Sequence, residues 1–238
     1  MAKRTKNRYV LCISDTHLPY SHPDNIPFLK AIANEYPIDR VLHMGDETDK
    51  HSLSFHDADQ ELFSAGHELE ESKKFLKEYY KLFPVVDVME SNHGSMVYRK
   101  AKHHGIPLHY IKDYADVLEA PDGWKWHADL TITLSNGQEC YFCHGIGADV
   151  KKVSQAMGMN VVQGHYHNTF KIDYWSNPNN LFWGMQVGCS IDDKSLAFAY
   201  NKNSPKRPII GHGIIIEGQP RLLPMILNKK GRWTGFVP

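Results

Sequence analysis

Five short segments of this 238-residue chain place aspartate, histidine and asparagine side chains directly after apolar runs. In chain order these segments are Ser14 to His17, Gly45 to Asp49, Asn92-His93, His144-Gly145 and Gly164 to His167. Aspartate, histidine and asparagine supply the oxygen and nitrogen ligands that divalent first-row metals select. The residue types therefore indicate metal-dependent chemistry, provided that the chain brings the five segments together.

The elements around these segments predict that they meet. Up to about residue 90 the pattern alternates between buried-type strands and segments with apolar residues at helical spacing. We expect strands at 8–13, 41–44 and 84–89, and helices at 24–36 and 66–83. Alternation of this kind predicts a parallel sheet, and ligands of such sheets bind beyond the carboxyl ends of the strands. All five segments are therefore expected to face one crevice.

From Trp124 onward the pattern changes to strands joined by turns, with Asn136-Gly137 as a hairpin signal. We predict an α/β fold of two facing mixed sheets that are covered on the outside by helices. A single domain is expected over residues 1–238, with residues 1–7 and 229–238 as loose tails.

The bulk composition limits the class of protein. Lysine plus arginine and aspartate plus glutamate both number 27, so the formal net charge is zero. This balance argues against a wide nucleic-acid-gripping surface but permits local basic patches. No apolar run approaches the roughly 18 residues of a membrane span, and the N-terminus lacks the apolar stretch of a signal peptide. We expect a cytoplasmic protein with no membrane association.

The number of charged ligands indicates two metal ions. Three carboxylates and at least four imidazoles would repel one another and be costly to desolvate without compensating cations. They also exceed what one ion can coordinate. Two ions about 3.5 to 4 Å apart suit in-line attack at phosphorus, so the predicted chemistry is metal-assisted hydrolysis of a phosphoester.

The five blocks, taken in order, resemble those of the calcineurin-like metallophosphoesterase superfamily. They are Asp-x-His, Gly-Asp-x-x-Asp, Asn-His, a lone His and Gly-His-x-His, and they span Asp15 to His167. The stretch from Gly45 to Ser54, followed by a long charged helix, is most similar to the small uncapped members found in bacteriophages. This resemblance implies a four-layer αββα sandwich. We expect two divalent ions, Mn²⁺ first, with Fe, Zn, Ni and Mg as alternatives.

The resemblance also implies a role for individual residues. The expected ligands are Asp15, His17 and His167 for one ion, Asn92, His144 and His165 for the other, and Asp46 as the bridge. His93 is the expected general acid, placed near the leaving-group oxygen or a phosphate oxygen.

Gly94 departs from the family pattern, which has an acidic residue after that histidine to orient the imidazole. Three explanations stay open: Asp49 or Glu90 substitutes, the leaving group needs less help, or activity is low. Asp49 has an equally good alternative role in bonding loop amides. The departure argues against a protein-serine/threonine phosphatase.

Two further residues are candidates for substrate binding. Arg99 lies one to two helical turns after Asn92-His93 and is suited to hold a phosphate, with a solvated helix face as the alternative. His51 follows the bridging block.

We predict hydrolysis of phosphodiesters of nucleic acid or nucleotides by a hydroxide that bridges the two ions. A phosphomonoesterase with the same site and a metal-binding scaffold without catalysis are the alternatives.

Overall fold

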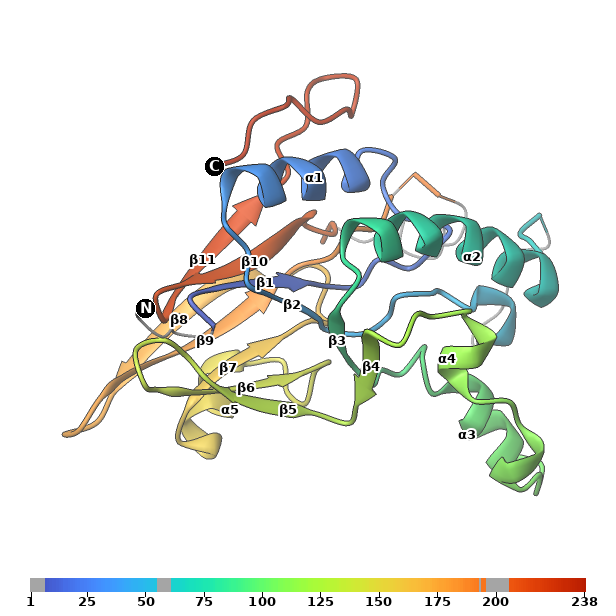
Figure 1. Cartoon of the computed structure of the whole chain (residues 1–238), viewed down its shortest axis with the longest axis horizontal. Helices are drawn as coiled ribbons and strands as arrows, with labels where there is room; N and C mark the ends of the chain where they lie inside the picture. Colours follow the sequence, from blue (N-terminus) through green and yellow to red (C-terminus); the bar gives the residue numbers. More distant parts are fainter. Residues whose placement is uncertain (1–6, 55–60, 193, 196–205) are drawn as a thin grey trace.

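The structure is a computed structural model that describes residues 7–54, 61–192, 194–195 and 206–238. Within these residues the strands form a six-stranded sheet of order β11-β10-β1-β2-β3-β4 and a five-stranded sheet of order β5-β6-β7-β9-β8 (Figure 1). The first sheet contains β1 (Tyr9–Ile13), β2 (Arg40–His43), β3 (Val86–Met89), β4 (Trp124–His127), β10 (Gly211–Ile216) and β11 (Gln219–Pro224). The second contains β5 (Leu130–Thr133), β6 (Glu139–Cys143), β7 (Asn160–Gln163), β8 (Phe170–Ser176) and β9 (Leu181–Val187).

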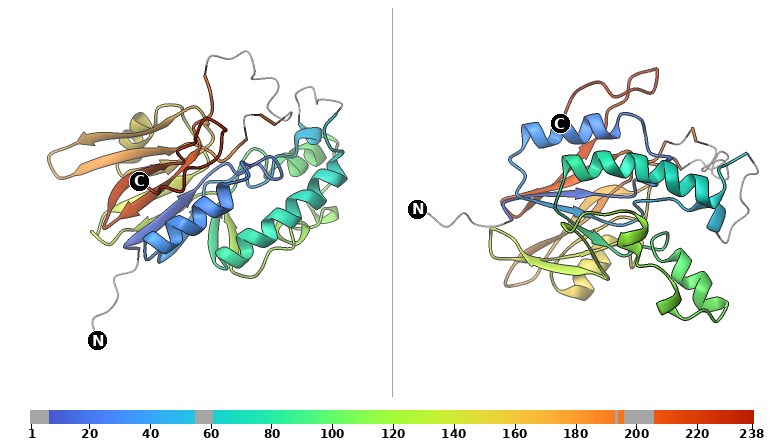
Figure 2. Two further views of the ribbon diagram at one scale, coloured as in Figure 1. Left: turned by 90° about the horizontal axis from the view of Figure 1, so that it is seen from above. Right: turned by 45° about the vertical axis from the view of Figure 1, so that its right-hand side comes forward.

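Helices cover the outer faces of both sheets. The helices are α1 (Asn25–Glu35), α2 (Ala65–Leu82), α3 (Met96–His103), α4 (Tyr114–Val117) and α5 (Val150–Met157), with short 3₁₀ turns η1 (His51–Leu53) and η2 (Leu108–Tyr110). Figures 1 and 2 show α1 and α2 side by side over the first sheet, whereas α5 packs on β7, β8 and β9 of the second. The predicted layering of helix, sheet, sheet and helix is confirmed.

Both faces of β1 are buried, which explains its continuous apolar sequence. Leu11 and Ile13 pack toward α1 and α2, while Val10 and Cys12 pack against the second sheet. Strands that are buried on both faces lack the alternation of a half-exposed strand.

Among the helices, α2 begins where the Ser64 side chain accepts a hydrogen bond from the backbone of His67.

Parallel pairing brings the predicted loops to one edge. Strands β1, β2 and β3 run parallel in the first sheet, and β6 and β7 run parallel in the second. The loops that follow these strands also contact one another. The Asp15 N–H donates to the carbonyl of Gly45 at 3.2 Å, and the N–H of His165, which follows β7 of the second sheet, donates to Asp15 Oδ2 at 3.0 Å. The carboxyl ends of the two sheets therefore share one crevice.

The C-terminal segment differs from the loose tail expected for residues 229–238. Arg232 forms an ion pair with Asp24, and the Trp233 ring lies 5.4 Å from that of Phe28 in α1. These partners lie more than 200 residues away in the sequence, so no local pattern could reveal them.

Of the N-terminal tail, residues 1–6 lie outside the described residues. Among the described residues, no helix is both long and apolar enough to cross a membrane.

Candidate metal centre

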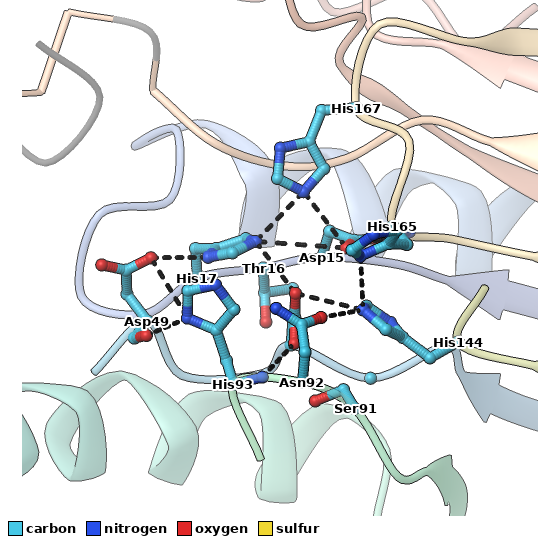
Figure 3. Close-up of polar contacts among 12 residues, drawn as sticks. Asp15, Thr16, His17, Asp49, Ser91, Asn92, His93, His144, His165 and His167 are labelled. Carbon is cyan, nitrogen blue, oxygen red and sulfur yellow. Dashed lines mark hydrogen bonds and ion pairs between the residues drawn. The ribbon is translucent and has the colours of Figure 1, made fainter. Parts of the chain in front are cut away.

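All the residues predicted to bind metal meet at the carboxyl edge of the two sheets (Figure 3). Their positions follow five different strands: Asp15 and His17 follow β1, Asp46 follows β2, Asn92 follows β3, His144 follows β6, and His165 and His167 follow β7. Figure 3 shows the side chains that it labels among these, namely Asp15, His17, Asn92, His144, His165 and His167, pointing toward a common centre.

One group of ligand atoms comes from Asp15, His17, Asp46 and His167. The Nε2 atoms of His17 and His167 are 3.2 Å apart, and His167 Nε2 lies 3.2 Å from Asp15 Oδ1. His17 Nε2 is also 3.5 Å from Asp46 Oδ2. Four nitrogen and oxygen donors thus converge within a space that suits a single ion.

A second group lies beside the first. His144 Nε2 is 2.7 Å from Asn92 Oδ1, 3.1 Å from His165 Nδ1 and 3.3 Å from Asp46 Oδ2. The same oxygen, Asp46 Oδ2, therefore lies close to a ligand atom of each group. A carboxylate in this position would be suited to serve an ion in each group.

Outer hydrogen bonds orient two of the imidazoles. His17 Nδ1 lies 2.6 Å from Asp49 Oδ1, and His144 Nδ1 lies 2.7 Å from the carbonyl of Met44. When Nδ1–H donates to these oxygens, Nε2 presents its lone pair to the cluster, as in most histidine metal sites. The donor set and its outer bonds are consistent with a dinuclear metal site.

The electrostatics also favour cations. Burial acts to lower the pKa of His144, but the Asp46 carboxylate outweighs it and raises that pKa to about 9. Burial acts to raise the pKa of Asp46, yet His144, His93 and His17 hold it well below its usual value. The site therefore attracts positive charge, which either a proton on His144 or a divalent ion in its place can supply.

Several of these residues have a left-handed backbone. The φ angles are 46° at Asp15, 44° at His17, 51° at Asp46 and 68° at His165. Such conformations are costly for residues with a Cβ and cluster at functional sites. Hydrogen bonds between loops hold them, for example from His17 N–H to the carbonyl of Asp46 at 2.9 Å.

The packing around Gly164 explains why the Gly-His-x-His block begins with glycine. A Cβ at Gly164 would lie 2.4 Å from Asp15 Oδ2 and 2.1 Å from Ser14 Oγ. Only glycine allows this approach, which also lets His165 N–H donate to Asp15 Oδ2 at 3.0 Å.

His93 lies at the rim of the centre. Its N–H donates to Asp46 Oδ1 at 3.1 Å, and its ring makes an edge contact with that of His17 at 4.8 Å. His93 Nδ1 bonds to the main-chain carbonyl of Asp49 and lies 3.8 Å from Asp49 Oδ1. Of the two acids expected to substitute at Gly94, Asp49 therefore lies beside the His93 ring, whereas Glu90 is exposed.

The two predicted substrate-binding residues lie in different environments. His51 is buried, with Nδ1 3.8 Å from Asp49 Oδ2 and its main-chain N–H donating to Glu68, so it packs behind Asp49. Arg99 is exposed on α3, and its guanidinium donates to the Asn92 carbonyl at 2.7 Å. Arg99 thus lies over the Asn92-His93 turn, while little of His51 is open to a substrate.

Sequence reasoning missed Lys50, which is 9% exposed and supports the His93 turn. Its ammonium donates to the carbonyls of His93 at 2.8 Å and Gly94 at 2.9 Å, and lies 3.9 Å from the Tyr114 ring centre. Burial lowers the pKa of Lys50 to about 8. The only sequence signal was its position beside Asp49.

Two mixed sheets with flanking helices match the αββα sandwich of metallophosphoesterases. Among solved structures, Vacuolar Protein Sorting 29 from Cryptosporidium parvum is similar, with a TM-score of 0.50 and 13% identity over 98% of this chain and 95% of that one. Vps29 from Chaetomium thermophilum has a TM-score of 0.50 and 9% identity over 95% and 94%. At such identities the likeness shows the fold alone.

A weaker likeness exists to the NAD nucleotidase NadN of Haemophilus influenzae, with a TM-score of 0.40 and 13% identity over 95% of this chain and 53% of that one. No protein-family model and no curated protein matches the chain. None of these three structures comes from a bacteriophage, so the expected likeness to bacteriophage members stays a prediction.

Proposed function

We propose that this protein is a dinuclear metal-dependent phosphoesterase that hydrolyses phosphodiester bonds of nucleic acid or nucleotides. The observation that carries this proposal is the position of Asp46 Oδ2, 3.5 Å from His17 Nε2 and 3.3 Å from His144 Nε2. The two ions, when bound, supply the positive charge that polarises water and a phosphate oxygen.

We assign roles to the chain's own residues on the basis of their contacts. Asp15, His17 and His167 would hold one ion, Asn92, His144 and His165 would hold the other, and Asp46 would serve both. His93 is fixed at the rim by two bonds, from its N–H to Asp46 and from Nδ1 to the Asp49 carbonyl. We assign His93 as the general acid that gives a proton to the leaving oxygen.

Asp49 replaces the acidic residue that the family has at the position of Gly94. Its carboxylate lies 3.8 Å from His93 Nδ1 and is a counter-ion for the protonated ring. The same carboxylate bonds to His17 Nδ1 at 2.6 Å, so one residue orients both a metal ligand and the proton donor. This arrangement supports catalysis over a scaffold role, because it fills the one gap in the family pattern.

Hydrolysis of bis-p-nitrophenyl phosphate and p-nitrophenyl phosphate, with Mn²⁺ added to metal-free protein, tests the function. We expect turnover only after Mn²⁺ is added, and faster turnover of the diester. Faster turnover of the monoester would favour a phosphomonoesterase. Binding of two ions without turnover with Mn, Fe, Zn, Ni or Mg would identify a scaffold. Manganese as the ion and a cytoplasmic location stay predictions from the sequence.

A further inference from the structure

A positively charged segment projects from the body next to the metal centre. It comprises residues 96–112, which include α3 and η2, and is called the basic arm below. Figures 1 and 2 show α3 and the turn after it at one extremity of the molecule, away from both sheets.

The basic arm has cationic residues and no carboxylates. The sequence from 96 to 112 contains no aspartate or glutamate, and its cations are Arg99, Lys100, Lys102 and Lys112, with histidines at 103, 104 and 109. The whole chain has a formal net charge of zero, so this is a local concentration of positive charge. Helix α2 differs in composition, because it carries carboxylates between its lysines, such as Glu70 at 3.0 Å from Lys73 and Glu78 at 3.2 Å from Lys81.

Apolar and aromatic side chains on the basic arm are open to solvent. Every residue from 102 to 110 is exposed, including Ile106 at 46%, Leu108 at 60% and Tyr110 at 75%. Ile106 and Leu108 border an open hollow of about 510 Å³ together with Arg99 and Lys102. Cations interleaved with exposed aromatic and apolar groups are typical of surfaces that track a phosphate backbone and stack bases.

The basic arm begins directly after the turn that contains Asn92 and His93, and it contacts that turn. The N–H of Met96, the first residue of α3, bonds to the carbonyl of His93 at 3.2 Å, and Arg99 bonds to that of Asn92 at 2.7 Å. A phosphate next to one at His93 would therefore meet Arg99, and Lys102 borders the same open hollow as Arg99.

We propose that the basic arm binds a single-stranded nucleic acid whose scissile phosphate lies at the metal centre, an inference that rests on the proposed function. The lysines and Arg99 contact successive phosphates, and Tyr110 stacks on a base. Stacking requires unpaired bases. The neutral charge of the whole chain argues against a duplex, which would need a wider basic surface. A single strand matches both the small size of the basic arm and its exposed ring.

Fluorescence anisotropy of a labelled single-stranded phosphorothioate 20-mer, which keeps its charge and resists hydrolysis, measures this binding directly. The test variant is Lys102→Gln/Lys112→Gln, and the matched control is Lys74→Gln/Lys81→Gln on α2, with the same change in net charge. Loss of two phosphate contacts lowers the slope of log affinity against log salt by about 1.4, which is about 25-fold in affinity at 0.1 M salt. We expect the control to bind within about twofold of wild type.

A second variant separates stacking from charge. Tyr110→Ala is expected to weaken binding by about fivefold or more with an unchanged salt slope, and Tyr110→Phe to restore it, because any aromatic ring stacks on a base. Thermal unfolding of each variant checks that the fold is retained.

Equal losses in the test and control variants, or no detectable binding by wild type, would overturn the proposal. So would arm-dependent sedimentation with phosphatidylserine vesicles in the absence of DNA binding, which would indicate a membrane surface. Turnover of bis-p-nitrophenyl phosphate is scored separately. Arm-dependent binding without that turnover refutes the proposed function alone, whereas turnover without arm-dependent binding refutes this inference alone.

Discussion

Replacing Asp49 by asparagine tests whether one buried carboxylate orients the first metal group. Asp49 is 3% exposed, and its Oδ1 lies 2.6 Å from His17 Nδ1. A hydrogen bond to a charged group contributes about 1.5 to 3 kcal/mol. At about 1.4 kcal/mol per factor of ten, its full loss corresponds to roughly 10- to 150-fold in metal affinity. The amide can still accept the bond, so we expect a loss of about tenfold, at the low end of the effects known for residues that orient metal ligands.

The loss is expected at one ion only. The second group is oriented separately, through the bond from His144 Nδ1 to the Met44 carbonyl. Isothermal titration of metal-free Asp49→Asn with Mn²⁺ should therefore show one weakened site and one within about twofold of wild type. Glu90→Gln is the control, because Glu90 is the other candidate acid and is exposed. Two unchanged sites in Asp49→Asn, or an equal loss in Glu90→Gln, would refute the reasoning.

Three further predictions concern His93, Asp46 and the ion pair between Asp24 and Arg232. His93→Asn should keep two ions per chain, measured by elemental analysis, and lose about 10²- to 10⁴-fold in turnover; loss of the ions would show a structural role instead. Asp46→Asn should lose both turnover and metal, because Oδ2 serves both groups, and a variant that retains two ions would contradict the bridge. The hydrogen bonds from Arg232 lower the pKa of Asp24 to about 2, so this carboxylate stabilises the fold above about pH 4 and loses that effect as the pH falls toward 2. Urea unfolding of Asp24→Asn should show a free energy of unfolding lower by about 1 kcal/mol at pH 7, after allowance for screening at the exposed Arg232. The difference from wild type should shrink as the pH falls below 4 and vanish only below pH 2, and a constant difference would argue against the ion pair.

Much of the architecture could be predicted from local patterns. The expected helices at 24–36 and 66–83 agree with α1 (Asn25–Glu35) and α2 (Ala65–Leu82) within one residue. Hydrophobic periodicity depends on neighbours a few residues apart, and α1 and α2 bury the face that the spacing predicts. The αββα sandwich followed from the strand and helix order together with the family resemblance.

Contacts between distant segments could not be predicted in the same way. Asp49 had two equal interpretations until the structure placed it between His17 and His93. Lys50 had no predicted role, and Arg232 lay in a segment expected to be loose. Each of these roles depends on which side chains pack against a position, and a single sequence carries no signal of that pairing.

The sequence by itself determined which chemical groups gather at the carboxyl edge, because strand order and the parallel rule apply before any side chain is placed. Only the tertiary structure decided that one oxygen of Asp46 lies between two histidine groups and that the Asp49 carboxylate lies beside the His93 ring. Which atom faces which partner depends on backbone dihedral angles, such as the left-handed φ of 51° at Asp46. Those angles are held by hydrogen bonds between loops that are far apart in the chain.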